Sequence, residues 1–166
     1  KPNSGYGDSM NLGLKRAHGA YIGILEPDDW IEPDAFEKLY AAAKKYQADV
    51  VKANYYKFRT IKKSERATIT TEISPADADQ VFRPAQNRHI FHFAPAIWSA
   101  IYRREFLLGN DINFLPTPGA SYQDLSFNFK VWTLAKKVVL LPDAFVHYRL
   151  DNSNSSVNNP NKLNCV

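Results

Sequence analysis

The sequence has one cysteine, Cys165, and no long hydrophobic run among its 166 residues. A single thiol cannot form an internal disulfide, so a disulfide framework is excluded and a reducing compartment is favoured. Every apolar run is well short of the roughly 18 residues that a membrane-spanning helix needs. No nucleophile triad, Cys/His pair, cysteine-based zinc site or phosphate-cradling glycine loop is visible. The remaining candidates for chemistry are carboxylates.

The charge of the chain is also modest. Lys and Arg exceed Asp and Glu by 21 to 17, which gives a net charge of +4 and a pI near 9.1. Such mild basicity can attract phosphate-bearing ligands or an anionic membrane surface. The basic residues are spread along the chain, and the densest stretch, residues 59–66, is interpreted as a solvated turn or strand edge. We therefore expect no nucleic-acid partner.

Helical and extended patterns alternate along the chain, which predicts an α/β domain with a mixed sheet flanked by helices. The apolar run 21–25 is typical of a strand buried on both faces. In the helix predicted over 122–135, Leu125, Phe129, Trp132 and Ala135 share one apolar face. The other predicted elements are a helix at 33–47, strands at 48–58, 66–73 and 97–102, a short helix at 104–108, and two strands joined by a turn at Pro142–Asp143. We expect one domain over 1–150 and a polar tail over 151–166.

An acidic cluster follows the first strand, in the stretch "GILEPDDWIEP". Glu26, Asp28 and Asp29 lie within four positions, so they repel one another unless a cation or solvent relieves them. Oxygen ligands of this kind suit Mg²⁺ or Mn²⁺. The alternative is a solvated loop in which one aspartate caps the next helix, and Asp29 is the strongest candidate for that structural role. The residues alone leave both interpretations open.

Three further segments carry candidate residues with equally plain alternatives. Asp124 opens a predicted helix, where an anion is favourable, so capping competes with a role as general base. Trp98 is either a core residue or a ring that stacks on a sugar. The segment "HYR" (147–149) precedes several hydroxyl side chains and suits either a phosphate or an ordinary exposed terminus.

The order of these segments resembles a family 2 glycosyltransferase of the GT-A fold over roughly residues 3–157. The resemblance rests on "NSGYGDSMNLGLKRAHGAYIGILEPDDW", then "IWSAIYRREFL", "YQDLSFNFKVW" and "HYRLDNSNSSV". It implies a nucleotide-diphosphate sugar as donor and Mn²⁺ or Mg²⁺ as cofactor. It also implies an inverting transfer, without a covalent intermediate, to a saccharide or lipid-linked saccharide in surface polysaccharide assembly. The expected location is the cytoplasm, with peripheral contact at the inner face of the membrane.

The resemblance assigns a role to each candidate residue. Glu26 and Asp28 would hold the metal, and Asp124 would be the general base that deprotonates the acceptor hydroxyl. The remaining side chains would contact the donor diphosphate (Asp29, Tyr148, Arg149) or the acceptor (Trp30, Trp98, Gln123).

Three departures from the family pattern qualify this interpretation. The first metal carboxylate is Glu26 where the family has Asp, and Gln123 stands where Glu is usual. Nothing before Lys1 supplies the nucleotide-binding half, so we expect a portion of a longer enzyme, weak or inactive alone. Exposed sheet edges would then favour a homodimer. The alternatives are a non-catalytic carbohydrate- or nucleotide-binding module on the same scaffold and a purely structural protein.

Overall fold

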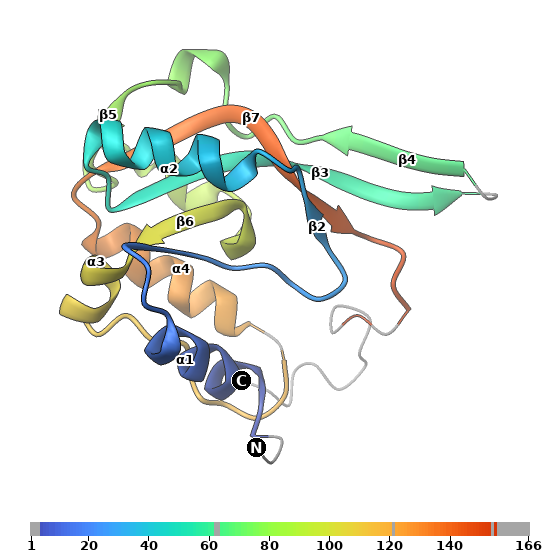
Figure 1. The fold of residues 1–166 in the computed structure, drawn as a ribbon, viewed down its shortest axis with the longest axis horizontal. Helices are drawn as coiled ribbons and strands as arrows, with labels where there is room; N and C mark the ends of the chain where they lie inside the picture. Colours follow the sequence, from blue (N-terminus) through green and yellow to red (C-terminus); the bar gives the residue numbers. More distant parts are fainter. Residues whose placement is uncertain (1–3, 62–63, 121, 154, 156–166) are drawn as a thin grey trace.

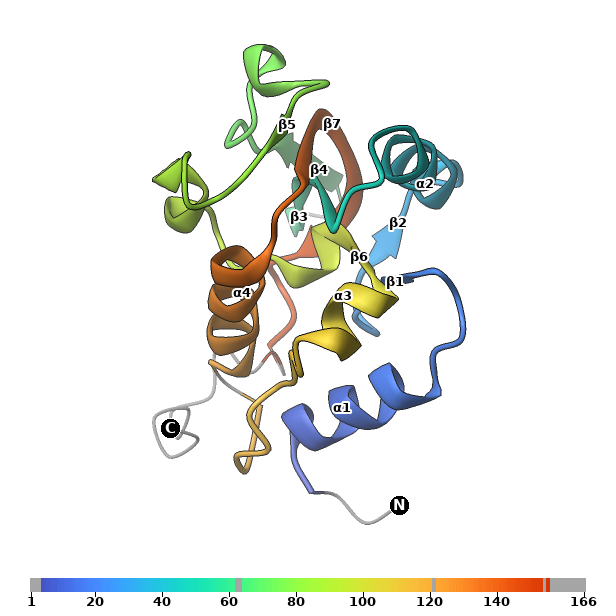
Figure 2. The same ribbon diagram turned by 90° about the vertical axis from the view of Figure 1, so that its left-hand side faces the viewer.

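A curved mixed sheet divides the protein into two layers of helices (Figures 1 and 2). The computed structural model describes residues 4–61, 64–120, 122–153 and 155. Helix α2 covers one face of the sheet, and α1, α3 and α4 lie on the other. Each face has its own apolar core, and the larger core lies under α4 around Phe127, Val131 and Trp132. The predicted mixed α/β fold is confirmed.

The strand order is β1-β6-β3-β7-β2, with β4 paired to β3 and β5 paired to β7. Strands β3 and β7 are parallel, and the other pairs are antiparallel. The elements are α1 (Tyr6–Arg16), β1 (Tyr21–Gly23), β2 (Trp30–Ile31), α2 (Ala35–Tyr46), β3 (Val50–Ile61), β4 (Ser64–Ile69), η1 (Pro75–Asp77), β5 (Val81–Phe82), η2 (Arg88–His92), η3 (Ile97–Ser99), β6 (Ala100–Arg103), α3 (Arg104–Gly109), α4 (Gln123–Leu134) and β7 (Val138–Arg149).

Two predictions about which apolar side chains are buried are wrong. Ile22 of β1 is buried in the larger core, but Tyr21 on the opposite face is only partly buried and Gly23 is exposed, so the strand is not fully buried on both faces. On α4, Leu125 and Phe129 are 49% and 62% exposed, whereas Phe127 and Val131 are fully buried. The buried face of α4 is therefore rotated relative to the predicted one, and its buried residues are Gln123, Phe127, Asn128, Val131 and Trp132.

The predicted turn at Pro142–Asp143 is also wrong, because β7 continues through it as one strand. The pairing with β3 steps from Ala53↔Leu141 to Asn54↔Ala144, which leaves the Pro–Asp pair in a bulge. Proline has no N–H to give to a ladder, and a bulge is where a sheet tolerates it. The Asn54 side chain fills the gap by donating to the carbonyls of Pro142 (3.0 Å) and Ile73 (2.8 Å).

Within the part of the chain that the structure describes, no helix is long and apolar enough to cross a bilayer. Most of the predicted polar tail, residues 154 and 156–166, lies outside the described residues.

Candidate active site

The acidic cluster forms the loop between β1 and β2, and α1 supports it from one side. The Tyr6 hydroxyl donates a 2.6 Å hydrogen bond to Oε1 of Glu26. Two glycines let the start of α1 pack closely against the segment 115–119. Gly5 has φ 96°, a conformation that other residues rarely adopt, and a Cβ on Gly7 would lie 1.9 Å from the Leu115 carbonyl oxygen.

The end of β7 holds the same loop from the other side. The backbone N–H of Arg149 donates to Oδ1 of Asp29 at 2.9 Å, and Arg149 Nε donates to the Asp28 carbonyl at 3.4 Å. The Asn152 side chain donates to Oδ2 of Asp28 at 3.0 Å. The loop is therefore fixed between α1 and β7 with its carboxylates close together.

Burial and mutual repulsion perturb these carboxylates. The pKa of Asp29 is raised to about 6, mainly by burial and also by the charges of Asp28 and Glu26, while the hydrogen bond from the Arg149 N–H opposes the shift. Burial also raises the pKa of Glu26, although the Tyr6 hydrogen bond lowers it and the charges of Asp28 and Asp124 raise it. Asp29 Oδ2 is buried and has no hydrogen-bond partner among the residues that the structure describes. This loop is therefore short of positive charge, as expected where a cation binds.

Asp124 reaches the same site from the first turn of α4. Its Oδ1 accepts the backbone N–H of Leu125 at 2.9 Å, and burial raises its pKa. Its charge also raises the pKa values of Tyr6 and Glu26, so the three groups share one electrostatic environment. The residue before the helix, Tyr122, has φ 68°, a strained backbone conformation of the kind that clusters at functional sites. Asp124 is not the N-cap of α4.

An aromatic wall made by Trp98, Tyr148 and Tyr55 adjoins the carboxylates. The rings of Trp98 and Tyr148 stack at 4.8 Å, and the Tyr55 ring meets Trp98 edge-on at 4.7 Å. Burial raises the pKa of Tyr148, followed by the charges of Asp29, Asp28, Asp124 and Glu26. Trp98 was predicted to lie in a strand, but it lies in the 3₁₀ turn η3, and β6 begins at Ala100.

The Arg149 and Trp30 side chains lie on the opposite face of the sheet from Tyr148, although Arg149 Nε still contacts the acidic loop. Side chains alternate along β7, so Arg149 points away from the face that Tyr148 occupies. The Arg149 guanidinium lies 5.7 Å from the Trp30 ring, and Trp30 stacks on His147 at 4.8 Å. The structure brings neither the Trp30 ring nor the Arg149 guanidinium to the aromatic wall.

Gln123 is an internal support, with a side chain that is 1% exposed. Its Nε2 donates to Thr117 Oγ1 at 2.9 Å and so ties α4 to the preceding loop. This burial does not support the predicted contact with an acceptor. Sequence reasoning missed Tyr6 and Asn152, and the signal available for Tyr6 was the short "SGYG" segment.

The donor set of the acidic loop suits a divalent cation that keeps other ligands. Among the residues that the structure describes, no three His, Cys, Asp or Glu side chains converge as a metal cage. Mg²⁺ and Mn²⁺ sites often use one or two carboxylates and complete their coordination with water and substrate phosphate. The raised pKa values and the unpartnered Asp29 oxygen fit such a partial site.

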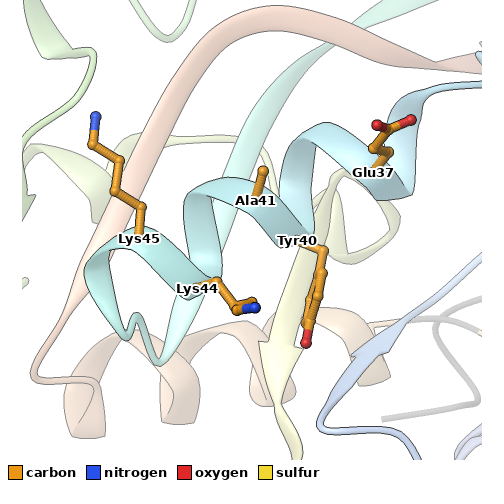
Figure 3. Close-up of a pocket in the computed structure, with 5 residues that line it drawn as sticks. All are labelled: Glu37, Tyr40, Ala41, Lys44 and Lys45. Carbon is orange, nitrogen blue, oxygen red and sulfur yellow. The ribbon is translucent and has the colours of Figure 1, made fainter.

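A separate shallow hollow on the outer surface of α2, around Tyr40 and Lys44, lies on the opposite face of the sheet from α4 (Figure 3).

Known proteins share both sequence and fold with this chain. EpsJ, an uncharacterised glycosyltransferase of Bacillus subtilis, is 28% identical over 96% of the chain and 46% of EpsJ. GlyA, a glycosyltransferase of Streptococcus pneumoniae, is 28% identical over 89% of the chain and 21% of GlyA. The chain thus spans less than half the length of these relatives. The crystal structure of residues 1–349 of Staphylococcus aureus TarS in complex with UDP-GlcNAc matches with a TM-score of 0.67 at 21% identity, over 90% of the chain and 40% of that TarS chain.

The TarS match is a likeness of fold, and it agrees with the predicted GT-A architecture. The family model of glycosyl transferase family 2 matches residues 1–107, which include the acidic loop, Tyr55 and Trp98. The chain therefore belongs to glycosyl transferase family 2.

Proposed function

We propose that residues 1–150 form the metal- and acceptor-binding portion of an inverting glycosyltransferase that uses a nucleotide-diphosphate sugar. One observation carries this proposal: the charges of Asp124 on α4 and of carboxylates in the β1–β2 loop raise the pKa values of the same two groups, Tyr6 and Tyr148. A candidate base thus lies within electrostatic reach of a candidate diphosphate site. The complex of TarS with UDP-GlcNAc makes a UDP-sugar the first donor to test.

Asp124 is positioned to act as the general base. Its carboxylate takes the proton of the acceptor hydroxyl as that oxygen attacks the anomeric carbon, and the bond from that carbon to the diphosphate breaks on the opposite face. Its raised pKa favours this role because a base works best when its pKa is close to the working pH. Trp98 and Tyr148 offer an apolar wall for the sugar ring beside the carboxylate.

The acidic loop would hold Mn²⁺ or Mg²⁺ through Asp28 and Glu26. Tyr6 orients Glu26, and Asn152 orients Asp28. Asp29 places its charge behind the diphosphate site while its Oδ1 fixes the end of β7. When bound, the cation neutralises charge that develops on the departing nucleotide diphosphate.

The surface of the chain supports a proposal about the acceptor. Phe91 and Phe129 are exposed with their rings 5.9 Å apart, and Arg88, Lys136 and Lys137 are exposed nearby along the chain. An exposed aromatic pair, in a chain of net positive charge, suits peripheral contact with an anionic membrane. This favours a lipid-linked saccharide as acceptor, at the inner face of the membrane in surface polysaccharide assembly. The edge strand β1 offers a surface for a homodimer.

Calorimetric titration of UDP, GDP and dTDP, with and without Mn²⁺, tests the donor site. We expect metal-dependent binding that Asp28→Asn abolishes. Asp34→Asn is the matched control, because Asp34 is an exposed aspartate that pairs with Lys38 on α2. Binding that ignores Mn²⁺, or that survives Asp28→Asn, would reject the proposed site.

A second measurement separates an enzyme from a non-catalytic binding module. An enzyme should slowly hydrolyse its UDP-sugar, since water can replace the acceptor hydroxyl, and Asp124→Asn should strongly reduce this hydrolysis while donor binding remains. Donor binding without any turnover would favour the binding module.

A further inference from the structure

Lys52 is a buried cation with no part in the site described above. It lies on β3 and is 1% exposed. Its Nζ donates to the Ala96 carbonyl at 3.1 Å and to Ser99 Oγ at 2.8 Å. A buried ammonium is costly unless its hydrogen bonds are made, so these two contacts account for its being tolerated there.

The two partners of Lys52 flank Trp98 in the chain. Ser99 Oγ also donates to the Ala96 carbonyl at 2.9 Å, so the ammonium and the hydroxyl close the same turn. Trp98 projects from this turn and stacks on Tyr148. A displacement of η3 would therefore move the indole relative to Tyr148 and to the carboxylates whose charges raise the pKa of Tyr148.

We propose that Lys52 is a positioning residue, which holds η3 so that Trp98 stays stacked on Tyr148 and shapes the wall that receives the acceptor sugar. The part of this inference that concerns the acceptor rests on the proposed function. The link between Lys52 and Trp98 is independent of that function, because it follows from the hydrogen bonds of Lys52 and the stacking of Trp98. An apolar side chain of equal size would fill the same space but would leave the Ala96 carbonyl without its ammonium donor.

The surroundings of Lys52 allow its proton to be followed separately. Burial lowers the pKa of Lys52 to about 8, and the charge of Glu72 opposes the shift. The Glu72 side chain accepts the N–H of Ala94, just before the turn. The nearby phenols, those of Tyr55, Tyr102 and Tyr148, all have raised pKa values and stay neutral at pH 8. Of these groups, Lys52 is the one expected to change its charge near pH 8.

Fluorine NMR of the chain labelled with 5-fluorotryptophan tests the link. The protein has three tryptophans, and Trp98→Phe assigns the resonance of interest. We expect the Trp98 resonance to titrate near pH 8 and to shift in Lys52→Met, with a larger solvent isotope effect as the indole becomes more exposed. The resonance of Trp132, which is 2% exposed, should stay unchanged and shows that the fold is intact.

Two further variants make this result decisive. Lys57→Met is the matched control, because Lys57 is an exposed lysine on the same strand, and it should leave the Trp98 resonance unchanged. Ser99→Ala removes one partner of the ammonium and should shift the resonance in the same direction by a smaller amount. If Lys52→Met fails to fold, Ser99→Ala decides. An unchanged Trp98 resonance in the folded variants overturns the proposal.

A sugar titration tests the role in the acceptor site. Methyl β-D-glucopyranoside and methyl β-D-galactopyranoside, added to the labelled chain, should perturb Trp98 but not Trp132, and Lys52→Met should raise the Kd at least fivefold. Equal affinity in both proteins, or no perturbation of Trp98 in the original chain, overturns the positioning role, while metal-dependent UDP binding would still support the donor site. Sugar binding that depends on Lys52, in a chain that binds no nucleotide, would keep this inference and reject the proposed transferase.

Discussion

Donor binding through the acidic loop should weaken as the pH falls from 7 to 5. A metal-bound diphosphate requires the carboxylates of the loop in their ionised form. Asp29 has a pKa raised to about 6, so it is mostly ionised at pH 7 and mostly protonated at pH 5. An aspartate with an ordinary pKa would stay ionised at both values.

The size of the effect follows from this pKa. Protonation of one group with a pKa near 6 lowers the affinity about tenfold between pH 7 and pH 5. Asp29 is half-buried, and salt screening lowers the expected loss to roughly threefold to tenfold. Glu26, whose pKa is also raised, adds to the loss in the same direction.

The assay is calorimetric titration of UDP-GlcNAc with Mn²⁺ at pH 7, 6 and 5. A UDP-sugar is preferable to UDP here because its diphosphate has no terminal phosphate that titrates in this range. Asp29→Asn keeps an oxygen that can accept the Arg149 N–H, so the hydrogen bond between the loop and β7 remains. The asparagine side chain does not titrate, so its protonation no longer contributes to the pH dependence. This variant should show a flatter pH profile, and Asp34→Asn should keep the original one. Constant or rising affinity toward pH 5, or an identical profile in Asp29→Asn, would refute the reasoning.

Three other changes test different parts of the molecule. Asp124→Asn should lower UDP-sugar hydrolysis by roughly 10²-fold to 10⁴-fold with donor affinity unchanged, as measured by nucleotide release. Asp49→Ala should lower the free energy of unfolding in urea by about 3 kcal/mol, because this buried carboxylate accepts two N–H groups from 136–137; Asp49→Asn should cost less. Tyr6→Phe should raise the pKa of Glu26 further and move the pH onset of Mn²⁺ binding upward, and an unmoved onset would contradict the role of the 2.6 Å hydrogen bond.

Local sequence patterns predicted the helices and strands of this fold better than they predicted the position of each element in the sheet. The helices at 33–47 and 122–135 and the hairpin partner at 66–73 were recognisable from spacing, and the structure has α2, α4 and β4 there. The edge position of β1 could not be recognised from the sequence, because a short apolar run looks the same at an edge and at the centre of a sheet. The bulge in β7 depends on Asn54, which is 88 residues from Pro142 in the sequence.

The candidate site was predictable where its chemistry lies in one short segment. The acidic cluster and Asp124 stand out by residue type, and the structure brings them together around Tyr6. Tyr6 is 20 residues from Glu26, so the partner that orients this carboxylate needs the tertiary fold. The resemblance places Arg149 at the donor diphosphate, and its Nε does contact the acidic loop at the Asp28 carbonyl, although the pleat of β7 puts its side chain on the opposite face from Tyr148.

The register of β3 explains why the aromatic wall could not be derived from alternation. Strict alternation puts Lys52 and Tyr55 on opposite faces, since they are three positions apart. Yet the Lys52 ammonium contacts the turn that carries Trp98, and the Tyr55 ring contacts Trp98 itself. The register shifts on both sides of Asn54 reverse the phase of the strand between these residues. The bulge at Pro142 thus brings a buried cation and an aromatic ring to the same indole, and the Asn54 side chain holds this bulge through its hydrogen bonds to the Pro142 and Ile73 carbonyls.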